Sequence, residues 1–120
     1  IEVYSGSQPI AASAAPTGTL LGTVTTGGVP FVPGTLTGAL EVEYDAVDGL
    51  VAVGDWRLKG VTNGIAGWWR WRWNSVDPGT DSQFYPRMDG AFGESLWLPS
   101  SSITAATNVP INSFKVNILE

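Results

Sequence analysis

Cysteine and histidine are both missing from the 120 residues of this sequence. Without cysteine there is no disulfide, and without either residue type the usual cysteine and histidine zinc site is excluded. The same absences exclude Ser-His-Asp and Cys-His catalysis, because the general base is missing. Acid–base chemistry would have to use carboxylates, lysine or tyrosine. We therefore expect a protein that is not an enzyme and that holds no cofactor and no metal.

Charged residues are few, at 14% of the chain against ~25% in an average globular protein. The six basic residues are scattered and the net charge is −5, which argues against nucleic acid as a partner. No apolar run approaches the roughly 20 residues of a membrane span, and no signal peptide is visible. We expect neither a nucleic acid nor a membrane partner. A low charge is typical of a protein whose surface is largely covered in an assembly.

Helical periodicity is also missing, whereas apolar and polar residues alternate repeatedly with the period of a β-strand. The alanine-rich stretch Ile10–Ala15 is bracketed by Pro9 and Pro16, which leaves room for one helical turn at most. The alternation is found in Ile1–Tyr4, Leu20–Thr25, Thr35–Ala46 and Ile111–Glu120.

Turn dipeptides separate these runs, which is typical of an antiparallel β-fold. Asn63-Gly64 favours a tight hairpin between Trp56–Thr62 and Ile65–Asn74. Seven to nine short strands at this spacing predict a single antiparallel β-sandwich or jelly-roll-like domain over residues 1–120. We expect Ser5–Thr17 to form a loop that lies across the surface of the fold.

Four of the six tryptophans lie in the run GIAGWWRWRWN, Gly64–Asn74. A period of two places Trp69, Trp71 and Trp73 on one wholly apolar face. Because each indole buries ~150–250 Å², this face is expected to form part of the core. Trp73 is near the end of the predicted strand, where it could lie at a rim.

The opposite face of the same strand carries Trp68, Arg70 and Arg72. Three roles stay open for it. The arginines could pack across strands and pair with Glu41 and Glu43. Tryptophan beside arginine is also common at the centre of protein interfaces. An aromatic row beside polar groups would also suit a carbohydrate platform.

Three pairs of carboxylates flank turns and are candidates for glycoside hydrolysis or Ca²⁺ binding. Turn formation explains each pair better, because an aspartate before glycine or proline accepts hydrogen bonds from its own turn. The pairs are Asp45 with Asp48, Asp77 with Asp81, and Asp89 with Glu94.

Five segments, taken in order, resemble a widespread group of small structural proteins of tailed bacteriophages. Each motif is short, and their order and spacing carry the resemblance, which covers most of the chain outside residues 27–62. The segments are IEVYSGSQP at Ile1–Pro9, PTGTLLGTV at Pro16–Val24, GIAGWWRWRW at Gly64–Trp73, MDGAFGESLWL at Met88–Leu98 and INSFKVNI at Ile111–Ile118.

This resemblance implies a β-rich accessory protein of the virion without enzymatic activity. The leading hypothesis is a capsid decoration or cement protein of the phage head, which binds the major capsid protein or other virion subunits as a homo-oligomer. A tail, neck or fibre-associated structural protein is a second hypothesis. A carbohydrate-binding adhesion module, with Trp68 or Trp73 stacked on sugar rings, is a third. The expected contact residues are Trp68, Arg70 and Arg72, together with Gln8 and Pro9 of the Ser5–Thr17 loop.

Overall fold

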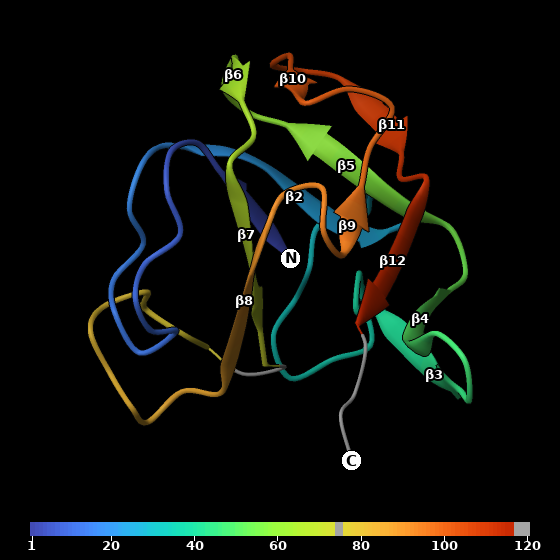
Figure 1. Ribbon diagram of the computed structural model, residues 1–120, viewed down its shortest axis with the longest axis horizontal. Coiled ribbons are helices and arrows are strands. Elements are labelled where there is room, and N and C mark those ends of the chain that lie inside the picture. Colours follow the sequence, from blue (N-terminus) through green and yellow to red (C-terminus); the bar gives the residue numbers. More distant parts are fainter. Residues whose placement is uncertain (74–75, 117–120) are drawn as a thin grey trace.

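The computed structural model describes residues 1–73 and 76–116, and every helix or strand within these ranges is a β-strand (Figure 1). Antiparallel sheets of six and four strands pack into a compact sandwich, which confirms the predicted all-β class. The strands are β1 (Glu2–Tyr4), β2 (Leu20–Thr26), β3 (Glu41–Asp45), β4 (Gly49–Val53), β5 (Trp56–Gly60), β6 (Gly64–Ile65), β7 (Trp68–Arg72), β8 (Arg87–Ala91), β9 (Leu96–Trp97), β10 (Ser102–Ile103), β11 (Asn108–Pro110) and β12 (Ser113–Val116).

The larger sheet has the strand order β11-β5-β2-β1-β7-β8, and the smaller one has the order β3-β4-β12-β9. A third pair joins β10 to β6. The short strand β1 lies in the middle of the larger sheet, where Val3 is opposite both Gly22 of β2 and Trp69 of β7. The first strand of the sequence therefore joins the two halves of the sheet.

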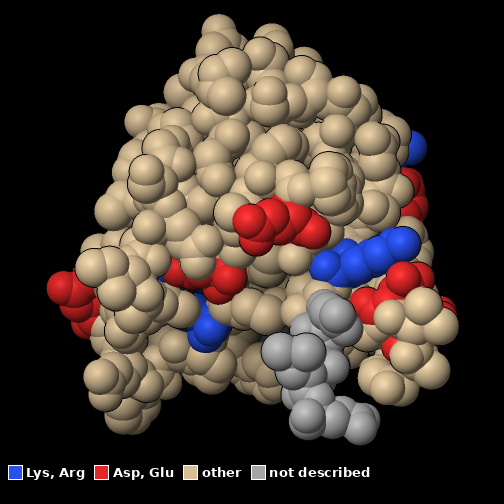
Figure 2. All heavy atoms as spheres, viewed as in Figure 1, with Lys and Arg blue, Asp and Glu red and all other residues tan. Residues whose placement is uncertain are grey.

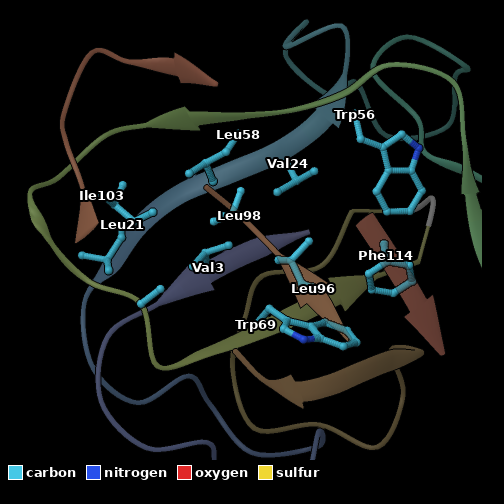
Figure 3. Packing of buried hydrophobic residues seen from close by; sticks show 11 residues of the cluster. Val3, Leu21, Val24, Trp56, Leu58, Trp69, Leu96, Leu98, Ile103 and Phe114 are labelled. Carbon is cyan, nitrogen blue, oxygen red and sulfur yellow. The ribbon is translucent and has the colours of Figure 1, made fainter. Parts of the chain in front are cut away.

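The core lies between the two sheets, and the side chains of Trp56, Trp69 and Phe114 lie together at one side of it, next to the aliphatic residues (Figure 3). Phe114 of β12 reaches across from the smaller sheet, with its ring 5.1 Å from that of Trp56 and 5.3 Å from that of Trp69. All three residues are at most 2% exposed. Because aromatic side chains bury a large apolar area per residue, this contact helps to hold the two layers together.

The alternating stretches predict strands with different accuracy. Leu20–Thr25 corresponds to β2. Thr35–Ala46 is a strand only from Glu41 onward, because Gly38 has a φ of +71° and a turn precedes it. Within Ile111–Glu120 the strand β12 spans Ser113–Val116, and residues 117–120 lie outside the described residues.

The predicted hairpin at Asn63-Gly64 is wrong. Strand β5 pairs with β2 and β11, whereas β7 pairs with β1 and β8, so the two predicted partners are not neighbours. The side-chain oxygen of Asn63 instead accepts a hydrogen bond from Ala105 N at 2.8 Å. Pairing with β1 buries Trp69 beside Val3, and this long-range gain overrides the local turn preference.

The expected count of seven to nine strands is too low, since the described residues contain twelve. Five of these have only two or three residues. Such short strands show no periodic pattern that a sequence reading can detect.

Candidate interaction surface

Trp68 begins β7 on the face that we expected to point outward, and it is fully buried. Its ring stacks on that of Tyr4, with 4.6 Å between centroids and 14° between planes. Its Nε1 donates a hydrogen bond to the carbonyl of Thr17 at 3.3 Å. The loop after β1 therefore folds back over the outer face and covers this indole with residues of the same chain.

Tyr4 keeps its proton in this setting. Burial, with a further contribution from the neighbouring Glu2 carboxylate, raises the pKa of Tyr4 to about 12. Its hydroxyl donates to Glu2 Oε1 at 3.0 Å.

Arg70 is also fully buried, and its positive charge is paired with the carboxylate of Asp89, which lies opposite it on strand β8. Its Nε and Nη2 donate to the two oxygens of Asp89, at 2.7 and 3.0 Å, in the paired geometry that makes arginine–carboxylate contacts strong. The guanidinium carbon lies 5.3 Å from the ring centre of Trp68. Arg70 Nη1 has no hydrogen-bond partner among the described residues.

Arg72 completes this face and is 19% exposed. Its Nε lies 2.5 Å from Glu2 Oε1, as an ion pair without hydrogen-bond alignment. Its Nη1 donates to the carbonyl of Asp77 at 3.0 Å.

The expectation that Trp68 and Arg70 present a contact surface to a partner is therefore wrong. Both side chains are covered from within the chain, so another subunit has no access to them. Of the three roles left open, cross-strand packing is the one found. The partner of Arg70 is Asp89, however, and neither Glu41 nor Glu43 pairs with either arginine.

A second buried arginine, Arg87 at the start of β8, ties two loops to the sheet, and sequence reasoning missed it. It donates to both oxygens of Asp77 at 2.7 Å. It also donates to the carbonyls of Thr80, Ala12 and Ser13, so that all three of its nitrogens are used. The Arg87 hydrogen bonds hold the pKa of Asp77 below its usual range. No sequence signal marks Arg87, because its partners, the Asp77 carboxylate and three backbone carbonyls, lie in two loops whose position relative to β8 the sequence does not show.

Of the carboxylates expected to form turns, Asp45 and Asp77 do so, whereas Asp89 lies in strand β8 and pairs with Arg70. Asp45 Oδ1 accepts the amides of Val47 and Asp48, and Asp77 Oδ1 accepts that of Gly79, as expected for turn formation. Within residues 1–73 and 76–116, no group of three or more acidic side chains is arranged to hold a metal ion.

Gln8 and Pro9 lie in the loop between β1 and β2, as expected. Gln8 is exposed and Pro9 is half-buried. The next residue, Ile10, is fully exposed. This loop lies beside the loop before β8 (Figure 1), and the amide of Ser82 donates to the carbonyl of Ser13 at 2.8 Å. A role for Gln8 and Pro9 in contacts with a partner stays a prediction.

The apolar face of β7 opens into a groove at its far end. Trp71 is half-buried, with its ring 5.4 Å from that of Phe114. Trp73 is 66% exposed, in agreement with a place at the rim. The groove has a volume of about 500 Å³ and lies between β7–β8, the loop before β3, and β3–β4. Its apolar lining consists of Phe31, Leu36, Ala39, Leu40, Val42, Leu50, Trp71, Trp73, Pro86 and Met88.

Polar groups along this groove are scarce. Arg72 and Arg87 contribute to the lining, but their donors are engaged by Glu2, Asp77 and backbone carbonyls. Glu41 also contributes to the lining, and its carboxylate forms no ion pair with a described residue. A sugar would require several uncommitted donors and acceptors, so the groove suits an apolar side chain better.

No helix in the described part of the chain is long and apolar enough to cross a membrane. Comparisons with protein-family models, with curated proteins and with solved structures found no match to this chain.

Proposed function

We propose that this protein is a structural component of a bacteriophage virion, namely a decoration protein that binds the capsid through protein–protein contacts. The observation that carries the proposal is the exposed apolar groove beside Trp73. Leu36 and Phe31 line the same groove and are exposed as well. An exposed patch of large apolar side chains with an aromatic anchor is typical of a protein interface.

The positions of the phage-like segments support this proposal. These segments contain β1, β6, β7, β9 and β12 and most of β2 and β8, so they supply four of the six strands of the larger sheet and two of the four strands of the smaller one. The groove draws on both parts of the chain: Trp71, Trp73 and Met88 belong to these segments, and Phe31, Leu36 and Leu40 to residues 27–62 outside them.

Add-back to capsids tests the proposal. Purified heads that lack the protein are incubated with it and imaged by electron microscopy, and we expect density at repeated lattice positions. Trp73→Ser should reduce the occupancy strongly, whereas Trp97→Ser removes a half-exposed tryptophan outside the groove and should not. Absence of the protein from heads contradicts the decoration role. Antibody labelling of tails or necks would then support the second hypothesis.

The carbohydrate hypothesis has one observation in its favour, the exposed indole of Trp73. A glycan array combined with tryptophan fluorescence tests it. Because the groove offers few free polar groups, we expect no sugar to change the emission of the protein.

A further inference from the structure

Strand β3 is an open edge of the smaller sheet. It pairs with β4 on one side, from Glu41 opposite Val53 to Asp45 opposite Gly49. On its other side no strand follows, and no backbone hydrogen bond joins it to any described residue outside β4. An edge of this kind can accept an additional strand from another chain.

The charges on this edge disfavour one class of partner, a second copy of the chain. Glu41 and Glu43 are exposed, and neither is in an ion pair with a described residue. Figure 2 shows acidic side chains gathered over β3 and β4, at the lower right. If two copies paired through β3, their carboxylates would face one another, which is destabilising. Lysine or arginine on a different protein would be attracted instead.

The apolar groove lies next to this edge. Val42 of β3 and Leu50 of β4, which is opposite Tyr44, line the groove, and Glu41 also contributes to its lining. Side chains alternate between the two faces of a strand. A strand added to β3 would therefore direct every second side chain toward the side of Val42 and the groove. The intervening side chains would lie on the side of Glu41 and Glu43.

We propose that the β3 edge and the groove together dock an extended segment of a partner protein in which apolar and basic residues alternate. The main-chain groups of the segment pair with β3, its apolar side chains enter the groove beside Trp73, and its basic side chains face Glu41 and Glu43. This proposal names the partner chemistry of the surface described above, and it rests on the proposed function as a protein that binds another virion subunit.

A synthetic peptide tests the recognition directly. The probe is a labelled peptide of about nine residues, long enough to pair with all of β3, in which valine or phenylalanine alternates with lysine. Binding to the full chain is measured by fluorescence anisotropy at low and high salt. We expect saturable binding that weakens with salt. Replacing each lysine by glutamate, or methylating alternate amide nitrogens to remove main-chain donors, should abolish it.

Variants of the protein locate the site. Trp73→Ser should weaken binding roughly tenfold, because an aromatic anchor is lost. Glu41→Gln with Glu43→Gln should weaken it about fivefold and remove most of the salt dependence. The matched controls Trp97→Ser and Glu94→Gln should bind as the unaltered protein does. Equal binding by the groove variants and the controls would overturn the proposal.

Three further results bear on the proposal: failure of the peptide to bind, dimerisation of the protein, and the binding of the variants to capsids. If the alternating peptide does not bind, or binds no better than a peptide of the same composition in scrambled order, the proposal is wrong. If sedimentation shows a dimer that Trp73→Ser dissociates, the groove is occupied by a second copy and the proposal is again wrong. Capsid add-back with the same variants separates the two claims. Heads that bind the groove variants normally contradict this inference alone, whereas heads that bind no form of the protein contradict the proposed function.

Discussion

At the scale of single residues, two buried arginines connect separate parts of the chain through paired hydrogen bonds. The guanidinium groups of Arg70 and Arg87 are fully buried, and each is paired with one aspartate through two hydrogen bonds. Burial of a charge is costly unless it is paired and hydrogen-bonded. The Arg70–Asp89 contact therefore favours the observed register of β7 and β8, and the Arg87–Asp77 contact favours the observed closure of the loop before β8 on the sheet.

Asp77→Asn tests this role. The substitution leaves the Arg87 charge buried without its counter-charge, and we expect a loss of ~3 kcal/mol in the free energy of unfolding. The control is Asp55→Asn, which removes an exposed ion pair with Arg57 and should cost under ~1 kcal/mol. Urea denaturation of both variants measures the difference. Equal losses of unfolding free energy in the two variants would show that the buried Asp77–Arg87 pair contributes no more to stability than the exposed Asp55–Arg57 pair.

The pH dependence of stability follows from the same pair. The pKa of Asp77 is lowered in the folded protein by Arg87, so the unfolded chain binds the proton more readily. The stabilisation is complete above the ordinary aspartate pKa of about 4, and it is lost as the pH falls through the lower folded value. We expect the urea midpoints of the unaltered protein and Asp77→Asn to converge as the pH is lowered from 5 toward 2. A constant gap across this range would argue against the assignment.

At the scale of strands, the close packing of β7 on β8 depends on a residue without a side chain. Gly90 lies directly opposite Trp69, and a Cβ at position 90 would collide with the indole ring. The absence of a side chain at Gly90 leaves room for the indole ring of Trp69 in the core. A sequence reading places Gly90 in a turn with Asp89, because nothing local indicates which tryptophan it faces.

A double-mutant cycle tests this contact. Gly90→Ala should destabilise the protein by ~1–3 kcal/mol through overpacking. In the background of Trp69→Leu the same change should cost less, because the smaller side chain leaves room for the methyl group. Thermal denaturation of the four proteins gives the coupling energy. Additive effects would show that the two positions do not compete for space.

Part of this architecture can be predicted from the sequence. The alternation in β2 and β7 predicts strands, and it places Trp69 in the core correctly. The burial of Trp68 cannot be predicted in this way, because the periodicity of one strand contains no information on the loop that covers it. The groove is equally hidden, since residues far apart in the sequence, such as Leu36 and Trp73, form it together.

At the scale of the whole molecule, apolar surface and negative charge lie side by side. The net charge of −5 makes identical copies repel one another at long range, while the groove leaves large apolar side chains in contact with solvent. This combination favours a partner of different composition over self-association.

A neutral apolar dye such as Nile red tests whether the groove is accessible in the free protein. We expect an increase in dye emission on binding. Trp73→Ser should lower the affinity about tenfold, equivalent to ~1.4 kcal/mol of lost apolar contact, whereas Trp97→Ser should leave it unchanged. A titration followed by fluorescence gives both values. Unchanged binding by Trp73→Ser would place the dye elsewhere on the molecule.

The central place of β1 also has a consequence for biosynthesis. Residues Glu2–Tyr4 leave the ribosome well before one of their two partner strands, β7, which ends at Arg72. At a synthesis rate of ~5–20 residues per second, the first strand waits on the order of seconds for that partner. During this interval the nascent chain exposes an unfinished sheet edge, so a chaperone that shields such edges should raise the yield of folded protein.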